Sequence, residues 1–271
     1  TPNTTTSLII GLLLALLLPI IFVFVRIVLY DKITDKKSLE KILSKNIPII
    51  GEIPFSNEQI ITKKTRGFLL ESFRLLRTNL NYLFENNTDC KTILVTSSIL
   101  KEGKTFTAIN LAQSLALANN KVVVLGLDLR NPQIHKYLEI TKDANLGVTN
   151  YLTDNAQDIN LLINQHPSID FDFILSGPIP PNPAELLLSE RLNDIIDFAR
   201  KNYDYVILDT APCLLVSDTL NILKYADATI YVTRSRYTEL NIIDYINQLK
   251  EENIVNNLSI VLNGLDQKSN K

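Results

Sequence analysis

The residues best suited to chemistry lie in one short segment, SSILKEGKT, which spans Ser97 to Thr105. An apolar run precedes the segment and a stretch of helical character follows it, so the segment is predicted to link a strand to a helix. In that context, the backbone N–H groups of the loop and the positive end of the helix bind phosphate groups. Gly103 allows close backbone approach, Lys104 reaches the β- and γ-phosphates, and the Thr105 hydroxyl holds Mg²⁺. The segment therefore predicts a phosphate site for a magnesium nucleotide.

The first position of the G-x-x-x-x-G-K pattern is Ser98, where the strict motif has glycine. Serine is compact, so we interpret the segment as a phosphate-binding loop with one substitution. Glu102 and Phe106 belong to the same stretch and are included among the expected nucleotide contacts. The alternative is an EGKT sequence that occurs by chance on a surface turn, and the predicted strand and helix on either side favour the loop.

Two aspartates follow apolar runs: Asp209 ends YVILD, and Asp128 follows VVVLGL. A carboxylate at the carboxyl end of a buried parallel strand is costly unless a cation or a hydrogen-bond donor pairs with it. A magnesium nucleotide supplies that partner. We therefore expect Thr105, Asp128 and Asp209 at the metal, and Lys104, Asp128 and Asp209 as the catalytic residues. The alternative for each aspartate is a helix N-cap or a turn residue.

The elements that must position these residues alternate along the chain. Strands are predicted over 92–97, 121–128, 171–175, 203–210, 228–234 and 258–264, and helices over 67–85, 104–118, 182–200 and 240–251. The strand runs lack in–out polarity, which is typical of a parallel sheet covered by helices on both faces. Asn182 is predicted to cap the helix that begins at Pro183, with Glu185 completing a capping box. The predicted fold class is α/β, a P-loop NTPase with a mostly parallel sheet.

An apolar stretch near the start predicts one transmembrane helix over residues 8–30, ahead of the α/β domain. About 23 residues at 1.5 Å each give about 34 Å of helix, which is enough to cross a bilayer. Residues 1–7 carry no charge, whereas basic residues follow at Arg26, Lys32, Lys36, Lys37, Lys41 and Lys45. The positive-inside rule then places everything after residue 30 in the cytoplasm. A signal-peptide core and a buried helix of a soluble protein are the alternatives.

Four segments are therefore expected: the end of an extracytoplasmic segment (1–7), the transmembrane helix (8–30), a juxtamembrane connector (31–65) and a cytoplasmic P-loop domain (66–271). In the connector, residues 38–44 are expected to form a short helix. Residues 47–55 are expected to be extended, because Pro48, Gly51 and Pro54 oppose a helix there.

The composition excludes several classes of protein. The 271 residues carry a formal net charge of −2, which argues against a nucleic-acid binder that works through bulk positive charge. Two cysteines cannot form a disulfide framework. The chain contains no methionine, even at position 1, so we expect it to be a piece of a longer polypeptide.

With these residues in place, the chain resembles the bacterial protein-tyrosine kinases (BY-kinases) of the capsular and exopolysaccharide family. In this family the kinase domain follows the second membrane helix of a polysaccharide chain-length regulator. The matching segments are the GEIP connector, the phosphate loop, VVVLGLDLRNP, YVILDTAP and GPIPPNPAELL. The resemblance implies that Arg130 contacts the nucleotide and that Asn263, in VLNG, contacts adenine. A plain turn residue is the alternative for Asn263.

The segment ESFRLLRTNL carries Glu71, Arg74 and Arg77 on one side of a predicted helix. From spacing alone, these residues form a solvated charged face. The resemblance implies instead that they are the family's E-x-x-R-x-x-R helix, which packs subunits into a ring.

The resemblance implies an ATP-dependent protein-tyrosine (auto)kinase that uses ATP and Mg²⁺ and regulates polysaccharide polymerisation and export. The implied partners are other copies of the chain in a ring, a tyrosine-bearing tail of a neighbouring subunit, the polymerisation and export machinery, and membrane lipid. Nucleic acid is not among them. The implied location is the bacterial inner membrane, with the kinase domain in the cytoplasm.

Two departures keep other interpretations open. Gly126 stands where the family motif D-x-D-x-R has its first aspartate, and the last tyrosine of the chain is Tyr245, so no C-terminal tyrosine cluster is present. Both favour a nucleotide-binding oligomerisation module with weak or no kinase activity. A ParA/MinD-like ATPase is a further alternative. That class has a signature lysine where this chain has Ile99, and Lys101 comes two positions too late.

Overall fold

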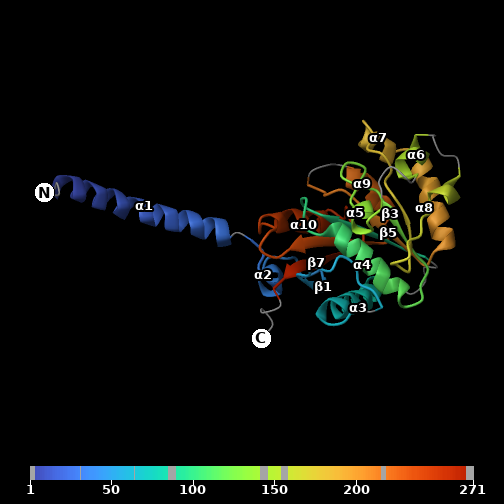
Figure 1. The fold of residues 1–271 in the computed structure, drawn as a ribbon, viewed down its shortest axis with the longest axis horizontal. Coiled ribbons are helices and arrows are strands. Elements are labelled where there is room, and N and C mark those ends of the chain that lie inside the picture. The colour runs from blue at the N-terminus through green and yellow to red at the C-terminus, as the bar shows by residue number, and fades with distance from the viewer. Residues whose placement is uncertain are drawn as a thin grey trace.

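The computed structural model describes residues 4–30, 32–63, 65–84, 90–140, 146–153, 158–214 and 218–266. Its centre is a seven-stranded sheet in the order β1-β7-β6-β2-β5-β3-β4 (Figure 1). The strands are β1 (Ile49–Pro54), β2 (Lys91–Ser97), β3 (Val122–Gly126), β4 (Asp172–Ile174), β5 (Tyr205–Asp209), β6 (Ala228–Arg234) and β7 (Leu258–Leu265). Every neighbouring pair is parallel, which confirms the predicted α/β class.

Helices connect the strands and cover the sheet. They are α1 (Thr4–Tyr30), α2 (Lys36–Glu40), α3 (Phe68–Leu80), α4 (Lys104–Ala116), α5 (Ile134–Tyr137), α6 (Val148–Leu152), α7 (Pro183–Leu187), α8 (Arg191–Asn202), α9 (Asp218–Ile222) and α10 (Ile242–Glu251). Short 3₁₀ turns, η1 (Asn81–Leu83), η3 (Ile159–Leu162) and η4 (Leu223–Tyr225), complete the described elements.

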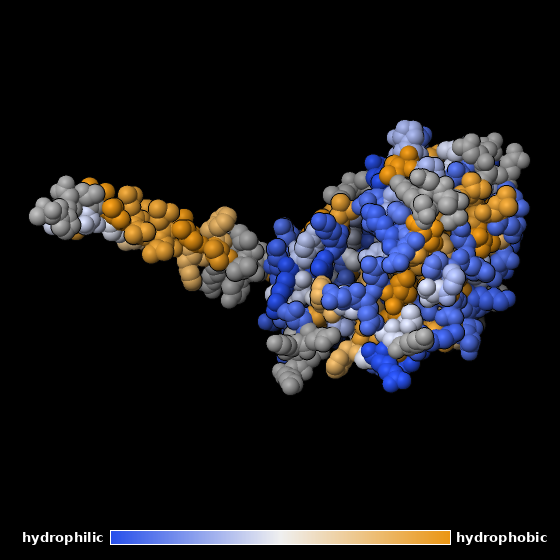
Figure 2. Space-filling model, in the orientation of Figure 1, coloured by the Kyte–Doolittle hydropathy of each residue, from blue (hydrophilic) through white to orange (hydrophobic). Residues whose placement is uncertain are grey.

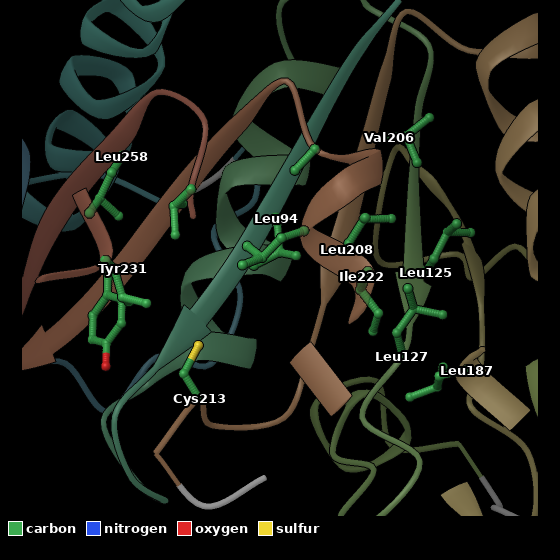
Figure 3. Packing of buried hydrophobic residues seen from close by; sticks show 14 of the residues in the cluster. Leu94, Leu125, Leu127, Leu187, Val206, Leu208, Cys213, Ile222, Tyr231 and Leu258 are labelled. Atoms are coloured by element: carbon green, nitrogen blue, oxygen red, sulfur yellow. The ribbon is translucent and has the colours of Figure 1, made fainter. Parts of the chain in front are cut away.

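Successive residues of each strand enter different hydrophobic clusters, because side chains alternate between the two faces of a sheet. On β2, Leu94 packs into the cluster that includes α8 and α10, whereas Ile93 and Val95 pack into the cluster that includes α3 and α4. Figure 3 shows part of the first cluster, with Leu94 and Leu208 from adjacent strands. Both faces are therefore buried, as the lack of in–out polarity predicts.

Helix α1 projects away from the α/β domain (Figure 1), and its surface is apolar along most of its length (Figure 2). The stretch of residues 7–25 is long and apolar enough to cross a membrane, and none of it is buried against the rest of the protein. The helix runs through Pro19. One such helix near the N-terminus is compatible with membrane anchoring.

The predicted helix over 182–200 is wrong in one respect, because it is two helices, α7 and α8. Ser189 lies between them, and its hydroxyl accepts a hydrogen bond from the backbone N–H of Arg191 at 3.3 Å, so a new helix begins there. The predicted cap is also wrong. Pro183 does begin α7, but the Asn182 side chain makes no capping hydrogen bond.

The short helix predicted over 38–44 begins earlier, at Lys36, and ends at Glu40. Asp35 caps it by accepting a hydrogen bond from Ser38 N–H at 2.8 Å. The helix predicted over 67–85 ends at Leu80 and continues as η1, while residues 85–89 lie outside the described residues.

Residues 47–55 include β1, which lies at the edge of the described sheet and pairs with β7. An edge strand tolerates proline, since one side of its backbone needs no ladder partner.

Candidate nucleotide site

The order of the strands brings the predicted site residues to one edge of the sheet. Strands β2, β5 and β3 are neighbours, and all three point the same way. The loop after β2 leads into α4 at Lys104, Asp209 is the last residue of β5, and Asp128 comes two residues after β3. The phosphate loop and both aspartates therefore meet at the carboxyl ends of the strands, where α/β folds bind ligands.

Lys104 lies between the two carboxylates. Its Nζ donates a hydrogen bond to Asp128 Oδ2 at 2.8 Å and lies 3.9 Å from Asp209 Oδ1. The Thr105 hydroxyl donates to Asp209, with Oγ1 at 3.1 Å from Oδ1 and 2.9 Å from Oδ2. Asp128 Oδ1 also accepts from the backbone N–H of Asn131 at 2.9 Å. The structure thus brings together the four residues expected for catalysis and metal binding.

Burial and charge act against each other in this cluster. Burial raises the pKa of Asp209 to about 6; the Lys104 charge opposes this rise, and the Asp128 charge adds to it. Burial alone would lower the pKa of Lys104, but the charges of Asp209 and Asp128 outweigh it and raise that pKa. One ammonium group faces two carboxylates, so the cluster has an excess negative charge that a divalent cation would neutralise.

The loop backbone needs glycine at Gly103. This residue has a φ of 98°, in the left-handed region, and an added Cβ would lie 2.0 Å from Asn263 Nδ2. Gly103 begins α4 without a side-chain cap, so the first N–H groups of the helix remain available for another acceptor. Backbone donors and a buried lysine at a helix start are the groups that bind phosphate.

Glu102 is buried inside the loop. One carboxylate oxygen accepts from the N–H groups of Ser98 and Ile99 at 2.6 and 2.8 Å, and the other accepts from the Thr238 hydroxyl. Burial raises the pKa of Glu102, while these hydrogen bonds act to lower it. Glu102 therefore ties the loop together from within. Ser98 is also fully buried, and its hydroxyl has no hydrogen-bond partner in the described part of the chain.

Three side chains from later parts of the chain donate hydrogen bonds to backbone carbonyl groups of the loop. Arg234 donates to Lys101 O at 2.8 Å, and Tyr237 donates to Leu100 O at 3.1 Å. Asn263 Nδ2 donates to Glu102 O at 2.9 Å. Sequence analysis missed Arg234, Tyr237 and Thr238, since no local pattern marks partners more than 130 positions away.

The segment 234–239, which includes Arg234, Tyr237 and Thr238, also forms hydrogen bonds with the connector. Ile33 N–H donates to Thr238 O at 2.9 Å, and Arg236 N–H donates to Ile33 O at 2.6 Å. Ser235 Oγ donates to Thr34 O at 2.6 Å. Residues 234–239 therefore contact both the phosphate loop and the first described residues after α1.

A cavity of about 680 Å³ opens beside the loop. Gly103, Lys104, Thr105 and Phe106 line it, together with Asn263, whose side-chain amide contacts the loop. Segments 54–59 and 131–137 contribute further to the wall. The cavity brings phosphate-binding groups next to the Asn263 amide, and such donors suit a nucleotide.

Arg130 binds a residue outside the cluster of Lys104, Thr105, Asp128 and Asp209. Its guanidinium binds the buried Asp218 carboxylate through two hydrogen bonds, Nε to Oδ2 at 2.6 Å and a terminal nitrogen to Oδ1 at 3.2 Å. Within the described residues, Arg130 is not part of the cavity lining, and neither is Asp128 or Asp209. The structure therefore shows that Arg130 contacts α9, and the contact with nucleotide that the resemblance implies stays a prediction.

Two of the three α3 residues face solvent. Glu71 and Arg74 are exposed and form an ion pair at 3.6 Å. Arg77 turns inward and donates to Ser114 O in α4 at 2.6 Å. Glu71 and Arg74 are thus available for a contact outside the chain, and Arg77 joins two helices of the same chain.

Gly126 ends β3 directly beside Asp209 in the sheet register. An added Cβ would lie 2.8 Å from Ser176 Oγ and 3.0 Å from the Ser176 backbone nitrogen. A side chain at this position would require its surroundings to shift.

Comparisons with known proteins agree with this geometry. The family model of the AAA domain matches residues 91–260. A protein of the cps region of Klebsiella pneumoniae, designated a tyrosine-protein kinase, is 30% identical over 282 residues, which are 96% of this chain and 38% of that protein. The chain therefore spans less than two-fifths of that relative's length.

Two further comparisons concern proteins of which this chain covers most of the length. The tyrosine-protein kinase YwqD of Bacillus subtilis (strain 168) is 36% identical over 171 residues, 62% of this chain and 70% of that protein. The solved kinase domain of the Escherichia coli tyrosine kinase ETK is 25% identical, with a TM-score of 0.76 over 88% of this chain and 97% of that one. Since the family model covers more than half of the chain and the Bacillus relative is covered over most of its length, the chain belongs to the AAA domain family and, within it, to the bacterial tyrosine-protein kinases.

Proposed function

We propose that the chain transfers the γ-phosphoryl group of MgATP to tyrosine hydroxyls. The observation that carries this proposal is the cluster at the start of α4, where Lys104 lies 2.8 Å from Asp128 and Thr105 contacts Asp209. Lys104 and Thr105 line a cavity of about 680 Å³, and Asn263 lines the same cavity. Phosphoryl transfer needs little covalent chemistry from the protein, and it depends on positioning and on charge stabilisation.

Each residue of the cluster has a proposed role. Lys104 and the first N–H groups of α4 bind phosphate oxygens, and Asn263 orients the base. Thr105 and Asp209 hold Mg²⁺, which when bound neutralises charge on the transferring phosphate. Asp128 accepts a hydrogen bond from Asn131 N–H, so its carboxylate is held in place to take the tyrosine proton or to support the metal.

The proposed biological setting is the regulation of capsular or exopolysaccharide polymerisation and export. The name of the Klebsiella relative, which refers to the cps region, supports this setting. The apolar helix α1 supports anchoring in the inner membrane, where this helix would contact lipid. The α/β domain would then lie in the cytoplasm. The exposed Glu71 and Arg74 support a contact between copies of the chain in a ring, and a tyrosine-bearing tail of a neighbouring subunit is a proposed substrate.

Gly126 favours a second candidate function, a nucleotide-binding assembly module without kinase activity. This position lies beside Asp209 and has no carboxylate, and an added Cβ, 2.8 Å from Ser176 Oγ and 3.0 Å from the Ser176 backbone nitrogen, would require the surroundings to shift. In that case nucleotide binding would set only the oligomeric state.

The decisive experiment incubates the full chain, in detergent micelles, with MgATP and a synthetic tyrosine peptide. Phosphotyrosine is measured on the peptide. Lys104→Met is expected to lower the rate about 100-fold or more, as when a charge-stabilising donor is removed. Lys121→Met is the matched control, since it removes a charge from an exposed position that is not among the described residues lining the cavity.

ATP binding is measured in parallel with a fluorescent analogue. If the natural sequence binds the analogue but never phosphorylates the peptide, the assembly module replaces the kinase. If Lys104→Met and Lys121→Met transfer phosphate equally fast, the cluster at α4 is not the site.

A further inference from the structure

Tyr82 differs from the other tyrosines of the chain in its surroundings. The sequence contains ten tyrosines. Of those whose side chains the structure describes, only Tyr82 is classed as exposed, with 83% of its surface accessible. A phosphoacceptor must enter another active site, so its hydroxyl has to be accessible before the reaction.

Most other described tyrosine hydroxyls are engaged or buried. Tyr203 donates to Asp172 at 2.7 Å, and Tyr225 donates to Asn193 at 2.5 Å. Tyr231 is fully buried in the core. These hydroxyls would have to leave the fold in order to react.

Tyr82 also shares a face with the residues expected to contact another copy. Phe68, Leu75 and Tyr82 follow one another at intervals of seven residues, and they are 75%, 55% and 83% exposed. Seven residues are nearly two turns of helix, so these side chains point to the same side of α3 and its continuation η1. The exposed Glu71 and Arg74 lie along the same helix. A face with large exposed apolar groups beside an ion pair suits a protein contact.

The chain's own phosphate loop lies at the other end of the sheet. Asn81, next to Tyr82, accepts a hydrogen bond from the Tyr205 hydroxyl at 3.4 Å, and Tyr205 is the first residue of β5. The phosphate loop instead follows the last residues of β2. Strand β2 runs from Lys91 to Ser97, and six steps of about 3.3 Å separate its ends by about 20 Å. Tyr82 is therefore out of reach of its own loop.

We infer that Tyr82 is a phosphorylation site, and that the nucleotide site of a second copy of this chain modifies it. This inference rests on the proposed kinase function. The Tyr82 oxygen attacks the γ-phosphorus of ATP, the bond from that phosphorus to the β–γ bridging oxygen breaks, and ADP leaves. The phenolic proton passes to the Asp128 carboxylate of the second copy and then to water. Copies anchored in one membrane present the acceptor and the site at high local concentration.

The test uses the full chain with MgATP and tryptic mapping. Cleavage after Arg77 and Lys91 gives a peptide, residues 78–91, whose only tyrosine is Tyr82. Phosphate on this peptide is expected for the natural sequence, and its loss is expected for Tyr82→Phe. The control Tyr245→Phe changes a partly buried tyrosine in α10 and is expected to leave phosphorylation of peptide 78–91 intact.

A mixing experiment separates transfer between copies from transfer within one. A ¹⁵N-labelled Lys104→Met chain serves as acceptor, and an unlabelled Tyr82→Phe chain serves as donor. Phosphate is expected on the labelled peptide 78–91 only when the donor is present. A synthetic tyrosine peptide in the same tube reports the kinase activity itself.

The outcomes are distinct. If the synthetic peptide is phosphorylated and Tyr82 carries no phosphate, the inference is wrong and the kinase function stands. If the natural chain carries phosphate on Tyr82 but the labelled acceptor carries none in the presence of a donor that phosphorylates the synthetic peptide, transfer between copies is wrong. If nothing is phosphorylated, the proposed function fails and the inference fails with it.

Discussion

Replacing Asp209 by asparagine is expected to stabilise the protein in the absence of Mg²⁺ and nucleotide. Burial raises the pKa of this carboxyl group from 3.8 to about 6. The folded state therefore binds the proton more tightly than the unfolded state. Between about pH 4 and pH 6 the folded protein holds more protons, so raising the pH through this range lowers the free energy of unfolding. A pKa difference of about 2 corresponds to about 3 kcal/mol.

Asparagine removes this cost and preserves the neighbouring contacts. Its oxygen still accepts from the Thr105 hydroxyl, and Lys104 keeps Asp128 at 2.8 Å. Urea unfolding of the full chain in micelles, in the presence of EDTA, should show Asp209→Asn more stable by up to about 3 kcal/mol at pH 7.5. The gap should shrink towards zero near pH 4, where the natural carboxyl is protonated. Adding MgATP should stabilise the natural chain and have a smaller effect on the variant.

Asp128→Asn is the matched control, because it removes the same charge but takes the nearest partner from Lys104, leaving a carboxylate 3.9 Å away. We expect it to be less stable than Asp209→Asn, since the lysine is then poorly paired. The reasoning is refuted if Asp209→Asn is less stable than the natural chain at pH 7.5, or if the gap between them does not change with pH.

Three other contacts lead to predictions. Gly126→Ala should lower the free energy of unfolding by about 1–3 kcal/mol, because the added Cβ lies 2.8 Å from Ser176 Oγ; an unchanged urea midpoint contradicts this packing. Thr238→Val should cost about 1–3 kcal/mol and weaken binding of a fluorescent ATP analogue, because a buried loop carboxylate loses its donor. Its control Thr238→Ser should bind normally, and equal binding by both variants argues against a role in holding the loop. Arg77→Ala should destabilise the chain, since the Arg77 guanidinium donates to a carbonyl of α4 at 2.6 Å. Arg74→Ala should instead change the free energy of unfolding by less than about 0.5 kcal/mol. It should also reduce the assembly that sedimentation velocity measures. Equal destabilisation by both arginine variants would contradict this division.

The central strands and the phosphate loop could be predicted because their signals are local. An apolar run such as YVILD needs no partner to be recognised as a buried strand, and Gly103, Lys104 and Thr105 stand in a pattern with fixed spacing. The meeting of Asp128 and Asp209 with the loop then followed from the rule that parallel strands bring their carboxyl ends to one edge.

Other features depend on contacts that no local pattern records. Asn182 has the residue type of a helix cap, yet its backbone lies at φ −128° and ψ 62°, and its side chain does not bond the helix. Arg130 was expected at the nucleotide because it stands in a family motif. Its partner Asp218, 88 positions away, became visible only in the folded chain.

The phosphate loop of this protein is held from outside its own motif as well as from within it. Thr238 connects two parts of the molecule, since its hydroxyl binds the Glu102 carboxylate and its carbonyl accepts from Ile33 N–H at 2.9 Å. Ile33 is fully buried, and the neighbouring Lys32 forms an antiparallel bridge with Glu239. Only residue 31 separates this bridge from the last residue of α1. Residues 32–34 therefore lie between the apolar helix and the segment that contacts the loop carrying Lys104. The same sequence, 234–239, fixes both the docking of the connector and the shape of the nucleotide site.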